Sequence, residues 1–157
     1  MGLVVAPCSP PTRTLDEVLA HFGESDGGAL ALRLLRDADD VEMALLVHGA
    51  ADASVEEFPE PLIELFPADR HGGHERIVSM LGELRSPETV PTLVEATRWI
   101  PEHLDFDEAR ALAVKAIWAL GGIPGEEARE VLEGLRDDEN EIIRENAVKQ
   151  LARRGEL

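Results

Sequence analysis

The segment with the best residues for chemistry is a short loop rich in histidine and acid. His71 and His74 stand three positions apart, Asp69 and Glu75 flank them, and Gly72-Gly73 lies between them. Imidazole and carboxylate groups at this spacing can bind a metal ion, and the two glycines would let the loop fold around it. The same pattern is typical of a glycine-rich connection that begins a helix. Because no further His or Cys ligand stands nearby, we predict that no metal is bound. A metal-dependent enzyme that uses Asp69, His71, His74 and Glu75 is kept as a hypothesis that ranks below two non-catalytic ones, which are given at the end of this section.

Other routes to catalysis have less support in the sequence. The single cysteine, Cys8, lies in a proline-rich segment, and neither a Gly-x-Ser-x-Gly elbow nor a P-loop occurs. The acidic segment 105–108 lacks the full spacing of an EF-hand and suits helix capping. We therefore predict that the protein is not an enzyme and needs no cofactor.

Composition excludes several classes of function. The chain has 157 residues, with 15 Lys and Arg against 32 Asp and Glu, which gives a net charge of −17. Such a surface repels nucleic acid and anionic membranes, and no apolar run approaches the ~18 residues of a membrane span. The first residues lack the early base of a secretory signal, which predicts a cytoplasmic location. We expect residues 1–13 to form a tail and residues 14–157 to form a single domain.

The elements that must position these residues are helices, because apolar residues recur with helical spacing almost throughout. Thr14 and Glu17 have the spacing of a capping box before the first helix. An offset of 31 residues reveals an internal repeat. Its apolar equivalents are Leu112 with Ile143, Ala116 with Ala147, Ile117 with Val148, and Leu120 with Leu151. An insertion falls around residues 98–104, and we expect Trp99 to pack locally within that longer loop.

Several short motifs in residues 74–155 resemble the HEAT repeat in its short bacterial, phycobilisome-lyase-type form. The likeness is carried by residues 138–152, by Val90-Pro91-Thr92-Leu93, and by Leu81-Gly82 and Leu120-Gly121. The resemblance implies an all-α fold, an α-α superhelix of about four helical hairpins. Its concave face would be built largely from the second helix of each hairpin. Such a motif is specific for fold and nearly silent about function.

Acid is concentrated in one part of the chain. Residues 37–69 contain ten acids and no Lys or Arg, among them Glu56, Glu57, Glu60 and Glu64. One interpretation is a solvated surface that serves solubility. The other is a surface that attracts a basic partner, which would relieve the repulsion among these charges.

A second apolar stripe lies on the helix predicted around residues 109–120. Ala111, Val114 and Trp118 form it, and their equivalents 31 residues later are Ile142, Glu145 and Lys149. Trp118 is either packed in a helix buried on two sides or exposed as an anchor for a partner. The residues that we assign to partner binding are Glu56, Glu57, Glu60, Glu64, Arg110, Ala111, Val114, Trp118, Glu145 and Lys149.

These features together predict a protein-binding module without catalysis. Bacterial HEAT-repeat proteins of this size and charge resemble immunity proteins, which neutralise a cognate toxin. The resemblance implies an antidote whose acidic concave surface covers a basic partner protein. The alternative is a structural adaptor or assembly factor for an endogenous complex. The sequence leaves the partner's identity and the oligomeric state open.

Overall fold

The computed structural model describes residues 14–37, 41–51, 59–68, 71–100 and 110–156. All regular structure in these ranges is helical, with no strand, which confirms the predicted all-α class. The elements are α1 (Leu15–Phe22), α2 (Gly27–Asp37), α3 (Val41–Ala51), α4 (Pro59–Leu65), α5 (His74–Leu84), the 3-10 turn η2 (Pro87–Thr89), α6 (Val90–Arg98), α7 (Ala111–Gly122), α8 (Glu126–Leu135) and α9 (Glu141–Arg154).

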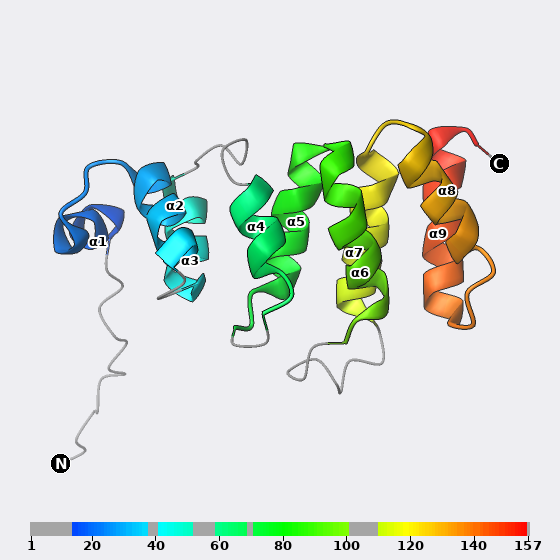
Figure 1. Cartoon of the computed structure of the whole chain (residues 1–157), viewed down its shortest axis with the longest axis horizontal. Helices are drawn as coiled ribbons and strands as arrows, with labels where there is room; N and C mark the ends of the chain where they lie inside the picture. The colour runs from blue at the N-terminus through cyan, green and yellow to red at the C-terminus, as the bar shows by residue number, and fades with distance from the viewer. Residues whose placement is uncertain (1–13, 38–40, 52–58, 69–70, 101–109, 157) are drawn as a thin grey trace, which may run out of the picture.

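The helices follow one another along the long axis of the molecule, from α1 to α9 (Figure 1). The pairs α6–α7 and α8–α9 are helical hairpins. The helix α4 packs against α5 in the same way, as the first helix of a pair. The second helices α5, α7 and α9 lie side by side with α7 in the middle. Further toward the N-terminus, α2 packs against α3 and also contacts α4. This arrangement agrees with the repeat-like helical stack that the sequence predicts.

Local signals set the limits of the helices. Thr14 Oγ1 accepts a hydrogen bond from the Glu17 backbone N–H at 3.3 Å, and the Glu17 carboxylate accepts one from the Thr14 N–H at 2.9 Å. This confirms the capping box before α1. Asn140 caps α9 by accepting a hydrogen bond from the Ile142 N–H at 3.0 Å. Within the described ranges, no helix is both long enough and apolar enough to cross a bilayer.

The predicted 31-residue repeat describes the core well, with one exception. Seven of its eight positions are buried, but Val148 is 38% exposed, whereas its equivalent Ile117 is fully buried. The difference follows from position in the stack, because α7 has a second helix on each side. In the described part of the chain, α9 has only α7 beside it in that layer. Pairing Val148 with the core was therefore wrong for this position.

Two glycines let the second helices approach closely. A Cβ atom added at Gly82 would lie 2.8 Å from the Ala119 Cβ, across the α5–α7 contact. One added at Gly121 would overlap Gln150 Oε1, across the α7–α9 contact. Ala119 and Gln150 are themselves 31 residues apart, so both junctions use the same repeat position. The Leu-Gly motif therefore has a steric cause.

We predict that Gly82→Ala destabilises the protein despite the higher helix propensity of alanine. The added methyl group would press on Ala119, including its backbone, so relief requires the helices to separate. The expected loss is about 1–2 kcal/mol, or a Tm about 3–6 °C lower in a thermal melt. Gly134→Ala on α8 is the matched control. A Cβ there meets nothing within 4 Å, so this variant should be slightly more stable. Equal melting temperatures for the two variants would contradict the steric account.

Candidate functional site

The histidine loop is built as a structural connection to α5. His71 Nδ1 accepts a hydrogen bond from the Gly73 N–H at 3.1 Å, so its Nε2 carries the proton and donates to the Leu65 carbonyl, also at 3.1 Å. Both ring nitrogens of His71 are thus engaged. His74 Nε2 lies 3.1 Å from the Ala68 carbonyl oxygen, and this ring is fully buried at the start of α5.

The histidine rings belong to a packed aromatic cluster. The His71 and His74 rings stack with centroids 4.2 Å apart, and Trp99 meets the His74 ring edge-on at 4.7 Å. Phe66 completes the cluster at 5.3 Å from Trp99. Trp99 therefore packs against Phe66 and His74, which lie outside the longer loop in which we expect it to pack from the sequence. These contacts fix the connection between α4 and α5.

The candidate metal ligands do not converge in the described residues. Asp69 lies outside them, and the Glu75 carboxylate lies 2.5 Å from Lys115 Nζ on α7. No group of three or more His, Cys, Asp or Glu that could hold an ion is found among the residues described. The two histidine side chains of this loop instead form hydrogen bonds to the backbone carbonyls of Leu65 and Ala68.

A groove lies across α5, α7 and α9. Its volume is about 960 Å³, and it is open along one side. Small residues line the groove where α5 meets α7 and where α7 meets α9, and larger side chains form its walls. The lining residues are Ser79, Gly82, Glu83, Arg85, Val114, Lys115, Trp118, Ala119, Gly121, Gly122, Gln150, Arg153 and Arg154. We call this feature the second-helix groove.

Trp118 forms one wall of the second-helix groove and is 46% exposed, so it is not a core residue. Its indole N–H donates a hydrogen bond to Asn146 Oδ1 at 2.9 Å. The Arg153 guanidinium carbon lies 4.9 Å from the centre of the Trp118 ring. Two contacts from α9 thus hold a large aromatic side chain in one orientation while much of it faces solvent.

Gln150 is an unusual residue for its position. Its side chain lines the groove but is only 2% exposed. The amide nitrogen Nε2 is buried and has no hydrogen-bond partner among the described residues. A buried donor left without a partner costs about 1–3 kcal/mol. The preceding repeat has Ala119 at the equivalent position, so a small apolar residue would fit the fold.

The charge of the second-helix groove differs from the acidic concave surface that we had expected. Arg85, Lys115, Arg153 and Arg154 line it, against the single acid Glu83. Lys115 is paired with Glu75, and Arg154 with Glu156. Neither Arg85 nor Arg153 has a carboxylate partner within the described part of the chain, and both are exposed. A protein of net charge −17 therefore presents a locally basic groove.

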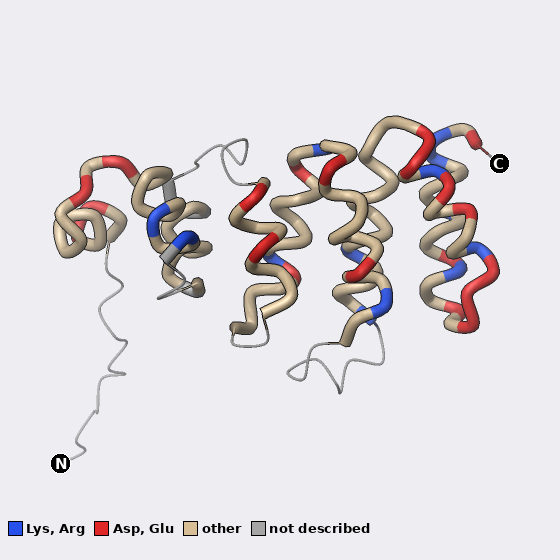
Figure 2. Tube along the Cα trace, viewed as in Figure 1, with Lys and Arg blue, Asp and Glu red and all other residues tan. Residues whose placement is uncertain are grey.

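Most exposed acids of the described residues lie on elements other than the three that form the groove. Figure 2 shows acidic positions on α4 and on α8 together with the turn that follows it. Glu60 and Glu64 are exposed on α4, which contributes no residue to the groove. Glu56 and Glu57 lie outside the described residues. The partner-binding residues that we predicted therefore belong to two separate surfaces.

The other predicted binding residues divide similarly. Val114 lines the groove beside Trp118, whereas Arg110, Ala111, Glu145 and Lys149 do not. Arg110 donates a hydrogen bond to the Thr97 carbonyl at 3.1 Å and precedes α7 in a left-handed conformation. Glu145 and Lys149 pair with each other on α9 at 3.5 Å. Our sequence reasoning missed Arg85, Gln150 and Arg153, although a glutamine in place of alanine was visible at the 31-residue offset.

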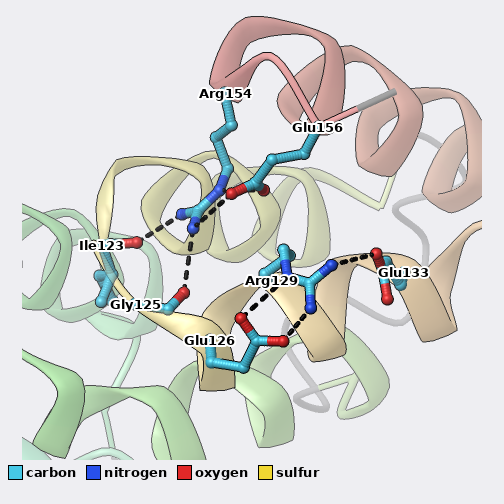
Figure 3. Close-up of polar contacts among 7 residues, drawn as sticks. All are labelled: Ile123, Gly125, Glu126, Arg129, Glu133, Arg154 and Glu156. Atoms are coloured by element: carbon cyan, nitrogen blue, oxygen red, sulfur yellow. Dashed lines mark hydrogen bonds and ion pairs between the residues drawn. The ribbon is translucent and has the colours of Figure 1, made fainter.

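Arg154 joins the end of α9 to the turn between α7 and α8 (Figure 3). Its guanidinium donates to the Ile123 carbonyl and, at 3.0 Å, to the Gly125 carbonyl, while Glu156 accepts from its Nε at 2.6 Å. The side chain is only 12% exposed. Nearby on α8, Arg129 pairs with Glu126 and Glu133. Arg154 is therefore a structural residue at the edge of the groove.

No family model, curated protein or solved structure that was compared with the chain gives a significant match. The similarity to the HEAT repeat stays a prediction from the sequence. The structure itself shows an all-helical, repeat-like fold.

We predict that Gln150→Met stabilises the protein. Methionine has nearly the same length and shape, and it removes the buried amide that lacks a partner. A gain of about 1 kcal/mol corresponds to a Tm about 2–4 °C higher. Urea unfolding with an unchanged m-value would check that the unfolded state is the same. A lower melting temperature would show that the amide has a partner in the folded protein.

Arg154→Ala should destabilise the protein by about 2 kcal/mol, because it removes charge-assisted hydrogen bonds to the two carbonyls and to Glu156. The corresponding fall in Tm is about 4–8 °C. The neighbouring Arg153→Ala is the control, since its side chain is exposed and contacts the Trp118 ring, a contact that contributes about 1 kcal/mol or less. Similar melting temperatures for the two variants would refute the structural role of Arg154.

Proposed function

We propose that the protein is a non-catalytic protein-binding module that takes part of a partner into the second-helix groove. The observation that carries the proposal is Trp118, a large aromatic side chain that lies half exposed on the wall of an open groove. Asn146 and Arg153 hold it in place, so little side-chain entropy is lost when a partner covers it. Tryptophan and arginine are the residues most enriched among binding hot spots.

Surface charge supports a more specific form of this proposal. The net charge of −17, with exposed acids on α4 and α8, favours a partner that is basic as a whole. An acidic, cytoplasmic antidote of the immunity-protein type would use this charge to attract its toxin quickly. The alternative is an adaptor or assembly factor whose acid serves solubility. An antidote binds one partner very tightly, whereas an adaptor binds several partners with moderate affinity.

The experiment is a pull-down from the native host with the tagged protein, at ~150 mM and ~500 mM salt, because that range strongly screens exposed charges. We expect one basic protein at near-equal molar amount. Trp118→Ala should weaken its binding by about 30-fold or more in a titration, the loss typical of an aromatic hot spot. Leu46→Ala is the matched control, since Leu46 is also a large exposed apolar residue but lies on α3.

Two charge-reversal variants locate the acidic contact. Glu60→Lys/Glu64→Lys changes α4, and Glu127→Lys/Glu130→Lys changes the net charge equally on α8. A larger loss for the α4 variant supports binding at that surface. Several partners of moderate affinity would favour the adaptor. Binding that survives Trp118→Ala unchanged would contradict the proposed use of the groove.

A further inference from the structure

We propose that the second-helix groove recognises an acidic segment of the partner, with side-chain carboxylates as the groups that it selects. This inference rests on the proposed function and deepens it. It assigns to the groove a charge preference opposite to that of the rest of the surface.

The charge of the lining residues is the first argument. Four lining side chains are cationic and one is acidic, in a chain with more than twice as many acids as bases. Lys115 and Arg154 are paired with carboxylates of the protein itself. Arg85 and Arg153 are not paired with any carboxylate in the described ranges. Partner carboxylates that reach the groove would meet guanidinium groups that still have hydrogen bonds to donate, Arg85 at the end of α5 and Arg153 on α9.

Gln150 is the second and independent argument. Its buried Nε2 lacks a hydrogen-bond acceptor among the described residues, and Arg85 and Arg153 in the same lining are donors as well. What these donors lack is therefore acceptors. Carboxylate and carbonyl oxygens supply them, whereas a lysine or arginine side chain would bring further donors and like charge. The equivalent residue 31 positions earlier is Ala119, so the fold does not need an amide at position 150. The amide of Gln150 therefore fits a role in binding.

Trp118 shows how the segment would lie. Arg153 packs over the Trp118 ring at 4.9 Å, which orients its guanidinium at the rim of the groove. Val114 and the ring offer apolar contact on the same wall, and Gly122, where an added Cβ would meet nothing within 4 Å, leaves room for an extended backbone. We infer a segment that places an apolar side chain on Trp118 and an adjacent carboxylate on Arg153. A partner that is basic as a whole can carry such a segment.

The test uses the full-length protein and a degenerate peptide library of eight random positions with an amidated C-terminus. Peptides retained on the immobilised protein are sequenced by mass spectrometry and compared with the input. We expect Asp and Glu to be enriched about threefold or more, together with apolar residues. Arg85→Gln/Arg153→Gln should abolish the acidic enrichment. Leu46→Ala on α3 should leave it unchanged, because that residue lies outside the groove.

Individual retained peptides then give affinities from the change in tryptophan fluorescence, to which Trp99 and Trp118 both contribute. Gln150→Met should weaken binding of an acidic peptide about tenfold, although we expect this variant to melt at a higher temperature. If Gln150 had only a structural role, a variant with a higher melting temperature would not bind the peptide more weakly. Equal affinity for the Gln150→Met variant would overturn the role of the amide.

Five outcomes would overturn the inference. Enrichment of Lys and Arg, or apolar enrichment without charge preference, leaves the groove as a binding site but refutes its acidic specificity. Enrichment only in a parallel library with a free C-terminal carboxylate assigns the groove to chain termini. Tighter binding of a labelled ten-nucleotide single-stranded DNA assigns it to phosphates. Retention of no peptide refutes the inference, while the pull-down with Trp118→Ala still decides the proposed function separately.

Discussion

The fold depends on the close approach of the second helices at Gly82 and Gly121. Each helical hairpin has an apolar stripe that it cannot bury alone, so neighbouring hairpins must supply the rest of the core. The two glycines lie where α5 meets α7 and where α7 meets α9, and neither junction has space for a further carbon atom without movement. Because α7 contacts both neighbours, the spacing at these two points sets the position of everything else in the C-terminal half of the chain.

The second-helix groove is a direct consequence of these junctions. Small residues between tightly packed helices leave an open space above them, and the longer side chains on either side become its walls. Its cations also have a local cause. Arg85 follows α5, and Arg153 and Arg154 stand in the last turn of α9, where positive charge is favoured by the helix dipole. Arg154 is used by the fold, whereas Arg85 and Arg153 contact no carboxylate among the residues that the structure describes, so under the proposed function they could bind a ligand.

The parts of the structure that the sequence could predict are those governed by periodicity. The helical class, the capping box at Thr14 and most of the repeated core follow from apolar spacing and from one local cap. Val148 was mispredicted because the pattern of a helix does not say whether another helix lies beside it. Trp118 was undecided for the same reason, since a second apolar stripe is compatible with burial or with exposure.

The candidate site was less accessible to prediction because it depends on orientation. Net charge does not say which helix faces carry it, so the basic groove of an acidic protein was not foreseen. The spacing of His71 and His74 suits a metal site, but the rings turn toward carbonyls of residues 65 and 68, whose direction is set by the connection itself. The one visible signal was Gln150, which differs in kind from Ala119 at an otherwise equivalent position.

Two surfaces of opposite charge make a binding protein more selective than either surface alone. Exposed acids on α4 and α8 attract basic partners from a distance, and this attraction is not specific because many proteins carry basic surfaces. Under the proposed function, a groove whose donors have no partner among the described residues would reject a basic segment through like charge and unmet hydrogen bonds. Only a partner with a basic body and an acidic segment at the right distance would satisfy both surfaces. Under the proposed function, the Gly82 and Gly121 junctions fix that distance, so the same packing that stabilises the fold would also determine which partner is bound.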